Sequence, residues 1–220
     1  GLYVVEDAAP SLGATYKGRR TGSFGHFATF SFQGAKLAVT GEGGMLVTSD
    51  EELYKKAYVI WDQGRKPGTF MIVSNGLKYK MSNVQAALGL GQLQRTEEMV
   101  AAKRRIYDWY REGLDGMPGI MVNQEAPWAR SICWMTSIIV GEEAGIDRDG
   151  MRAELLKRNI DSRSVFPAIS QYPIWNERID PCPVAKKIGD SAINLASGVC
   201  LSKAEVEYIC KAIRDIVGKR

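Results

Sequence analysis

The first part of the chain alternates short apolar runs with polar, glycine-rich segments. Each run is continuous, which is typical of strands that are buried on both faces of a parallel sheet. A long helical stripe follows; it is expected to begin at Ser82, because Ser82 and Gln85 fit a capping box, and to reach about Leu114. The strands are predicted at residues 2–5, 27–32 and 44–48, and a further helix at residues 49–52 and beyond.

The pattern changes after residue 114. The turn-forming run Gly116-Met117-Pro118-Gly119 predicts a linker. Beyond it we expect an α+β arrangement that ends in an amphipathic helix, which a second capping box opens at Ser202. The chain is therefore predicted to contain two domains, residues 1–114 and 115–220. The expected elements of the second are strands at 132–140 and 160–166 and a helix at 149–158.

Composition narrows the class of protein. The 220 residues are 45% apolar and 25% charged, as in ordinary globular proteins, and the net charge of +4 is spread along the chain. The densest basic stretch, residues 103–105, lies in a helical stripe, so we expect a solvated helix face and no nucleic-acid partner. The four cysteines lack metal-site spacing and the single histidine is His26, so we expect no metal. Without a signal peptide or a long apolar span, we expect a cytoplasmic protein with no membrane contact.

Candidate chemistry gathers where the apolar runs end. Lys36 follows the second strand in a turn of small residues, and the carboxyl ends of strands are where α/β folds bind ligands. Alone, a lysine beside glycines is usually on the surface, and Asp7 alone would be a cap or loop acid. Together, Asp7, Ser31 and Lys36 offer a partner for a ring nitrogen, a phosphate donor and an imine nitrogen, as pyridoxal phosphate (PLP) requires. A P-loop is excluded, because no Gly-x-x-x-x-Gly-Lys-Ser/Thr occurs.

Ordered motifs around these residues resemble one enzyme family along essentially the whole chain. They are Val4-Val5-Glu6-Asp7-Ala8-Ala9, Gly22-Ser23-Phe24-Gly25, Phe30-Ser31-Phe32, Thr40-Gly41-Glu42-Gly43-Gly44, Gly76-Leu77-Lys78-Tyr79-Lys80-Met81-Ser82-Asn83 and Ser162-Arg163-Ser164-Val165-Phe166. In this order they are similar to the DegT/DnrJ/EryC1/StrS family of PLP-dependent sugar aminotransferases, and within it to the perosamine synthase branch.

The resemblance implies an α/β fold of the PLP-dependent transferase type, which is aspartate aminotransferase-like (fold type I). Residues 1–114 would form the C-terminal part of the large PLP-binding domain, with a mainly parallel sheet. Residues 115–220 would form the small α+β C-terminal domain. Family members are longer, so the chain, which begins inside an expected buried strand, is expected to lack the N-terminal part and to be poorly soluble alone.

The resemblance also implies roles for the residues at the strand ends. Lys36 would bind PLP covalently and later move the proton between the substrate carbon and the cofactor carbon. Asp7 would keep the pyridine nitrogen protonated, and Ser31 would bind the phosphate. Ala9 would leave room for the ring. The catalytic pair is therefore expected to be Lys36 and Asp7.

Other expected site residues lie further along the chain. Lys78 and Lys80, in a segment where many family members have asparagine, would reach the phosphate of the partner's cofactor in a homodimer with shared active sites. Tyr79 and Arg163, with the loop 171–175, would line the pocket for the acceptor sugar.

The implied reaction is the transfer of an amino group from glutamate to a nucleotide-linked keto-deoxysugar, at C4 of a 4-keto-6-deoxy sugar, as in deoxysugar biosynthesis for lipopolysaccharide O-antigen. A 3-keto-sugar aminotransferase and an aminoshikimate-type synthase of the same family stay open. The family's 3-dehydratases have histidine where this chain has Lys36, which favours transamination. The non-enzyme alternative is an inactive fragment or an interaction module on the aminotransferase scaffold.

Overall fold

The computed structural model describes residues 1–175 and 182–218. It divides into two compact units, Gly1–Val100 with Glu125–Trp134 and Ala101–Gln124 with Met135–Arg220. Helix α3 (Thr96–Leu114) begins in the first unit and ends in the second. The units therefore part within α3, ahead of the predicted boundary at residue 114, and the assignment of the two domains stays a proposal.

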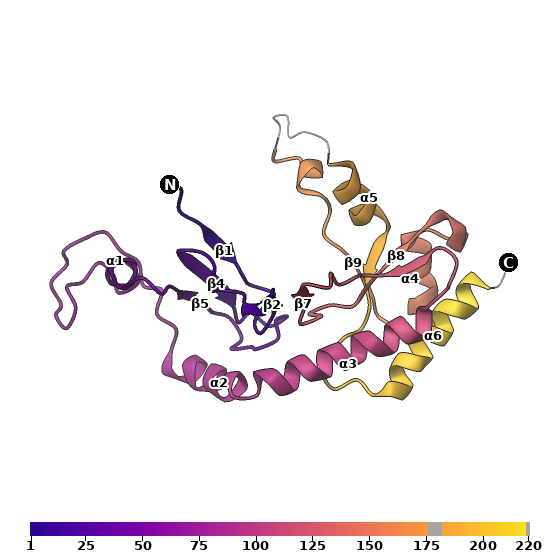
Figure 1. Cartoon of the computed structure of the whole chain (residues 1–220), viewed down its shortest axis with the longest axis horizontal. Coiled ribbons are helices and arrows are strands. Elements are labelled where there is room, and N and C mark those ends of the chain that lie inside the picture. The colour runs from indigo at the N-terminus through magenta and orange to yellow at the C-terminus, as the bar shows by residue number, and fades with distance from the viewer. Residues whose placement is uncertain (176–181, 219–220) are drawn as a thin grey trace. The chain divides into compact units, whose positions relative to one another are not determined.

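The first unit contains the sheet that carries the predicted site. Its order is β1 (Val5–Asp7), β4 (Phe27–Ser31) and β5 (Gly44–Val47), as Figure 1 shows. β1 and β4 are parallel, and β4 and β5 are antiparallel. With the surrounding helices this is a mixed α/β structure, which confirms the predicted fold class.

The first strand lies later in the chain than predicted, and its apolar residues are not buried. Pairing begins at Val5, opposite Phe27, so residues 2–4 precede the ladder. Leu2 is 92% exposed and Val5 is 61% exposed. The expectation of a strand buried on both faces is wrong for the described residues, because the side chains of β1 are left open to solvent, and β1 also pairs along one edge only, with β4.

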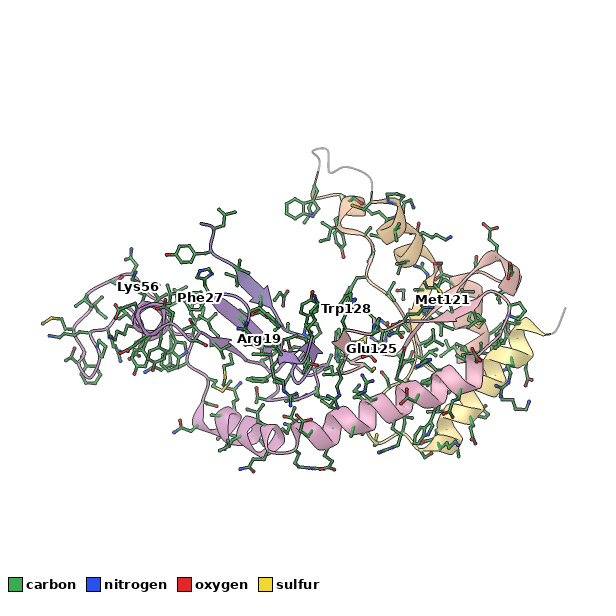
Figure 2. All side chains as sticks on the ribbon, viewed as in Figure 1. Arg19, Phe27, Lys56, Met121, Glu125 and Trp128 are labelled. Carbon is green, nitrogen blue, oxygen red and sulfur yellow. The ribbon has the colours of Figure 1, made fainter. Side chains whose placement is uncertain are left out.

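A small antiparallel sheet completes the strands of this unit, with β2 (Thr15–Tyr16) between β3 (Arg19–Arg20) and β7 (Ala129–Arg130). Tyr16 makes edge contacts with the rings of Phe24 and Trp128, at centroid distances of 5.8 and 5.2 Å; Figure 2 labels Trp128. The core of the unit is small. Its buried residues are Ala14, Leu37, Val100 and Ile132.

The helices of the first unit begin where capping residues predict. The side chain of Asp50 accepts hydrogen bonds from two backbone N–H groups at the start of α1 (Glu51–Trp61). The capping box of Ser82 and Gln85 opens α2 (Asn83–Leu93). The predicted continuous helix to Leu114 is wrong, because α2 ends at Leu93 and α3 begins at Thr96. The Thr96 hydroxyl donates to the Leu93 carbonyl at 2.8 Å, a side-chain bond that competes with the helical ladder.

The second unit is an antiparallel sheet against helices. The order of the strands is β6–β8–β10–β9, and the core combines residues from α3, the sheet, α4 and α6. The elements are β6 (Ile120–Val122), β8 (Ser137–Val140), β9 (Arg163–Ser164), β10 (Ala192–Asn194), α4 (Arg148–Leu156), α5 (Pro183–Ser191), α6 (Lys203–Val217) and the short 3₁₀ helices Glu142–Ala144 and Ile169–Gln171.

Two predicted strands of this unit are shorter than expected. The run 132–140 forms a strand only from Ser137, because Cys133 has a left-handed backbone (φ 51°) that a strand cannot contain. The run 160–166 pairs only at Arg163–Ser164. The capping box at Ser202, in contrast, opens α6 as predicted. None of the helices in the described residues is long and apolar enough to cross a membrane.

Candidate active site

Lys36 lies in a tight turn after β4. Its backbone N–H donates to the carbonyl of Gln33 at 2.9 Å, and the Gln33 side chain accepts from the Ala35 N–H at 2.8 Å. The turn returns to the strand end, because the Thr40 N–H donates to the Phe32 carbonyl at 2.9 Å. Local hydrogen bonds therefore set the direction in which Lys36 leaves the backbone.

Helix α2 anchors the rest of this loop. The Gln92 side chain accepts from the Val39 N–H at 2.9 Å, and its amide donates to the Val39 carbonyl. Gln85 also donates to the Glu42 carbonyl at 2.9 Å. Because a glutamine amide can satisfy one backbone donor and one acceptor together, α2 ties down the chain on the far side of Lys36.

Trp134 contacts both Lys36 and the turn that carries it. The Lys36 ammonium lies 4.1 Å from the centroid of the indole ring, and the indole N–H donates to the Ala35 carbonyl at 2.7 Å. An ammonium over an indole face is an attractive cation–π contact. Trp134 was not among the predicted site residues, because it lies 98 positions from Lys36 in the chain and no local pattern links the two.

Ser31 and Asp7 end two neighbouring parallel strands. Asp7 lies opposite Thr29 in the parallel pair of β1 and β4, and Ser31 follows Thr29 by two residues. The Asp7 and Ser31 side chains therefore lie at the same end of the sheet, where the two strands have their carboxyl ends. The Ser31 hydroxyl accepts from the Gln33 N–H at 3.3 Å. The structure thus brings Asp7, Ser31 and the Lys36 turn to one edge of one sheet.

Asp7 is exposed, and its carboxylate accepts from the backbone N–H of Ala9 at 3.1 Å. We expected a carboxylate at a buried strand end with a cationic partner, and the described residues show no such ion pair. Asp7 has no need of a cationic partner because it is exposed at the end of β1. A carboxylate in water is solvated without a counter-ion, whereas a buried one is not. The neighbouring Ala8 is buried and Ala9 is partly buried.

Glu6, which the sequence analysis did not select, supports the loop beside this edge. Its carboxylate accepts from the backbone N–H groups of Gly22 at 2.7 Å and Gly25 at 2.6 Å, and from that of Phe24. Partial burial raises the pKa of Glu6, but these hydrogen bonds outweigh it, so the pKa lies below its usual value of 4.5. Glu6 holds the glycine-rich loop against β1.

The segment with Lys78, Tyr79 and Lys80 is attached to the end of α1. Asp62 and Lys78 form an isolated antiparallel bridge, and the Tyr79 N–H donates to the Trp61 carbonyl at 3.3 Å. The Lys80 ammonium is 2.6 Å from the Asp62 carboxylate. Tyr79 is 64% exposed. The two lysines therefore differ: Lys80 is engaged in an ion pair, whereas Lys78 is solvent-exposed.

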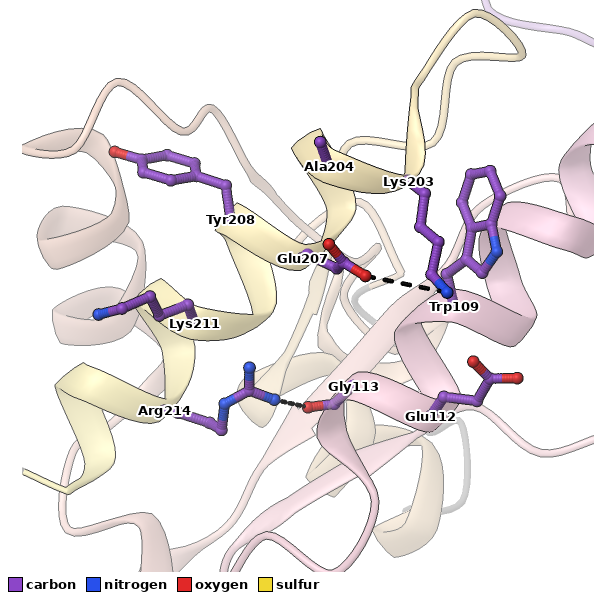
Figure 3. A pocket seen from close by; sticks show the side chains of 9 residues that line it. All are labelled: Trp109, Glu112, Gly113, Lys203, Ala204, Glu207, Tyr208, Lys211 and Arg214. Carbon is purple, nitrogen blue, oxygen red and sulfur yellow. Dashed lines mark hydrogen bonds and ion pairs between the residues drawn. The ribbon is translucent and has the colours of Figure 1, made fainter.

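Arg163, the other expected substrate residue, belongs to the second unit. It is in β9, is exposed, and lies 3.6 Å from Asp161. A cavity of about 540 Å³ between α3 and α6 (Figure 3) is also in the second unit, and its lining contains none of the expected site residues.

The residues at the sheet edge fit PLP by their chemistry. A lysine amine, a hydroxyl and a carboxylate are the donors and acceptors that the cofactor's aldehyde carbon, phosphate and ring nitrogen need. Among the described residues no cluster of side chains could hold a metal ion instead.

Comparisons with known proteins agree with this chemistry. Residues 1–214 match the model of the DegT/DnrJ/EryC1/StrS aminotransferase family, whose members depend on PLP. A GDP-perosamine synthase of Caulobacter vibrioides is 36% identical over 98% of this chain and 59% of its own.

Two solved structures are also similar. A DesI structure determined with its TDP-sugar product has a TM-score of 0.90 and 27% identity over 100% of this chain and 56% of its own. The PLP form of a Streptococcus pneumoniae protein described as a putative sugar aminotransferase has a TM-score of 0.84 and 28% identity over 99% and 58%.

The chain thus spans about three fifths of the length of these relatives. The family model covers nearly all of this chain, including Asp7, Ser31 and Lys36. The chain belongs to the DegT/DnrJ/EryC1/StrS aminotransferase family.

Proposed function

We propose that the protein with this chain is a PLP-dependent aminotransferase that moves an amino group from glutamate to C4 of a nucleotide-linked 4-keto-6-deoxysugar. The observation that carries the proposal is the gathering of Asp7, Ser31 and the Lys36 turn at one sheet edge. The names of the similar proteins, GDP-perosamine synthase and DesI with a TDP-sugar, support the class of acceptor.

Each residue at the edge would contribute one function. Bound PLP would supply an electron sink for the substrate carbon that loses its proton. The Lys36 amine would be the point of covalent attachment and would carry that proton. The Asp7 carboxylate would hold a proton on the ring nitrogen, and the Ser31 hydroxyl would donate to the phosphate.

The contact with Trp134 and the α2 anchors support the role of Lys36. A lysine that must exchange a proton at a defined carbon has to be held within hydrogen-bonding reach of it. The turn from Gln33 to Lys36 is fixed from both sides, which is not typical of a surface lysine in a flexible loop.

We further propose a homodimer in which the segment of Lys78 and Lys80 serves the partner's site. Two observations support it: Lys78 is exposed, and so are many large apolar side chains of the first unit. None of the four cysteines forms a disulfide bond, which supports the cytoplasm as the location. A role in O-antigen biosynthesis would follow from a 4-amino-4,6-dideoxysugar product.

The direct test is Lys36→Ala in the full-length protein. We expect no absorbance band of lysine-bound PLP and no turnover with glutamate and a GDP-linked 4-keto-6-deoxysugar. Turnover at the wild-type rate would refute the role of Lys36. Asp7→Asn should leave the unfolding temperature nearly unchanged, since Asp7 is exposed, and should slow the glutamate half-reaction.

A further inference from the structure

Three exposed aromatic rings lie together on and beside the small antiparallel sheet of the first unit. They belong to Tyr16, Phe24 and Trp128, whose exposed fractions are 41%, 42% and 54%. Tyr16 makes edge contacts with both of the other rings, and Figure 2 labels Trp128. Large apolar side chains that gather in this way at a surface, and do not lie singly, are typical of a site that binds a partner.

The backbone holds these rings in a fixed arrangement. Tyr16 pairs with Ala129 in the antiparallel register of β2 and β7, and the Lys17 N–H donates to the Trp128 carbonyl at 2.7 Å. The tight turn between β2 and β3 has left-handed backbone at Lys17 (φ 48°) and Gly18 (φ 79°). A surface that is ordered before binding loses little conformational entropy when a partner binds, so this arrangement favours affinity.

Two cations lie over the rings. The Lys17 ammonium is 5.4 Å from the centroid of the Tyr16 ring, and the Arg19 guanidinium is 4.6 Å from that of the Phe24 ring. The Arg19 Nε donates to the Ser23 hydroxyl at 3.0 Å, and a second N–H donates to the Ser23 carbonyl. These bonds fix the guanidinium over the ring, while its other N–H groups can still donate to a ligand.

The charge of these two cations is not balanced locally. Neither Lys17 nor Arg19 forms an ion pair in the described part of the chain. Glu6 interacts with Arg19 by charge, but its carboxylate is already bonded to three backbone N–H groups. Arg20, by contrast, has a counter-ion in Glu97 at 2.5 Å. The patch therefore presents two positive charges that carboxylates of a partner would complement.

We propose that this aromatic patch, which consists of Tyr16, Lys17, Arg19, Phe24 and Trp128, is a docking surface for an acidic segment of a partner protein. Tryptophan, tyrosine and arginine are the residue types that contribute most to binding between proteins. Carboxylates of the partner would bind Lys17 and Arg19. An apolar or aromatic side chain of the partner would pack on the exposed part of Trp128.

A nucleic acid fits the aromatic patch less well. Single-stranded nucleic acids bind where open ring faces stack on the bases and a groove of cations follows the backbone. Here Lys17 lies over the Tyr16 ring and Arg19 lies over the Phe24 ring. Two cations over two rings form no track for a run of phosphates, whereas they match separate carboxylates of an acidic peptide.

The aromatic patch has to be open to solvent in the full-length protein, and oxidative footprinting with mass spectrometry measures this. Hydroxyl radicals should modify Tyr16 and Trp128 several-fold faster than the buried Tyr110, whose exposed fraction is 0%. If Trp128 in the full-length protein reacts as slowly as Tyr110, the rest of the protein covers the patch and the proposal is overturned.

A fluorescently labelled copolymer of glutamate and tyrosine is the probe for docking. By anisotropy with the full-length protein at low ionic strength, Arg19→Gln and Trp128→Leu should each weaken binding about tenfold or more. Lys17→Gln, at an exposed turn, should act in the same direction without disturbing the fold. Lys56→Gln, which removes an exposed lysine of α1 that Figure 2 labels, should leave the affinity unchanged. Wild-type affinity in both Arg19→Gln and Lys17→Gln would overturn the proposal.

Two further polymers test the chemistry of the partner. Polyglutamate, which lacks rings, should bind more weakly than the copolymer, and this difference should vanish in Trp128→Leu. Polyuridylate should bind more weakly than the copolymer; tighter binding of polyuridylate that Arg19→Gln abolishes would replace the acidic protein with a nucleic acid. None of these measurements needs turnover, so the docking proposal stands or falls separately from the aminotransferase activity.

Discussion

At the scale of single residues, Glu6 links stability to pH. Its folded-state pKa is depressed, so its contribution to stability is fully present above the ordinary value of 4.5 and is lost as the pH falls through the lowered value. Glu6→Gln removes the charge that accepts three backbone N–H groups. We expect a loss of about 1–3 kcal/mol in the free energy of unfolding at pH 7.

Urea unfolding of the full-length protein at pH 7 and at acid pH checks this expectation. The difference between wild type and Glu6→Gln should shrink as the pH falls below 4.5. An equal difference at both pH values would show that the Glu6 charge has no part in holding the loop.

We expect Trp134 to assist Lys36 only by holding the lysine side chain and its turn in place. Trp134→Leu removes the ring 4.1 Å from the ammonium and the hydrogen bond to Ala35. Because these two contacts hold the Lys36 side chain and its turn in place, PLP should attach to the variant more slowly. The increase in absorbance of lysine-bound PLP after mixing measures the rate.

Trp128→Leu is the matched control, since Trp128 packs on Tyr16 and not on Lys36. It should attach PLP at the wild-type rate. The labelling of Lys36 by an amine-specific reagent, followed by mass spectrometry, gives a second readout that is independent of activity. If PLP attaches to Trp134→Leu and to Trp128→Leu at the same rate, Trp134 does not position Lys36.

At the scale of elements, α3 and α6 approach closely where Gly113 faces Cys210. A Cβ at Gly113 would lie 2.6 Å from the Cys210 sulfur, and the Gly113 carbonyl accepts from Arg214, as Figure 3 shows. Burial raises the pKa of the Cys210 thiol to about 11, so a neutral sulfur occupies this contact at neutral pH.

Gly113→Ala should therefore destabilise the protein. Helix propensity favours alanine by about 0.8–1 kcal/mol, and overpacking costs about 1–3 kcal/mol, so a net loss of about 1 kcal/mol is expected. In the double variant with Cys210→Ala the contact with the sulfur is absent, but the Cβ of residue 210 would still lie 3.0 Å from the added Cβ, so the loss from Gly113→Ala should become smaller. If urea unfolding shows that the two substitutions change the free energy of unfolding additively, the close contact between Gly113 and Cys210 would be contradicted.

Capping and turn signals predicted the starts of elements better than their ends. Asp50, Ser82 and Ser202 each cap a helix as their local sequence indicates. The break at Thr96 and the left-handed Cys133 were not predicted, because the first depends on a side-chain hydrogen bond and the second on a backbone angle, and the hydrophobic pattern encodes neither.

At the scale of the whole molecule, the two units differ in how much apolar surface they bury. The second has a continuous core of residues from α3, α4, α6 and the sheet. The first exposes apolar side chains in residues 2–5, the segment 70–73 and α2, including Leu2 at 92% and Phe70 at 87%. Exposed apolar surface of this kind is typical of a protein–protein interface or of a protein that aggregates.

We therefore expect the 220-residue polypeptide to self-associate when it is produced by itself. Light scattering should report a mass well above 24.3 kDa, and a dye that binds apolar surface should fluoresce in its presence. A monodisperse monomer that unfolds cooperatively and does not bind the dye would show that the exposed residues of the first unit are tolerated in water.

The sequence by itself determined the family, the fold class and the candidate lysine. These depend on the order and spacing of motifs such as Phe30-Ser31-Phe32 and on local capping, which act between residues close in the chain. Only the tertiary structure decided that Trp134 contacts Lys36, that Asp62 pairs with Lys80, and that the Nε of Arg65 is buried without a hydrogen-bond partner among the described residues. The physical reason is that ion pairs, ring contacts and burial join residues far apart in the chain, and local patterns do not encode which of them meet.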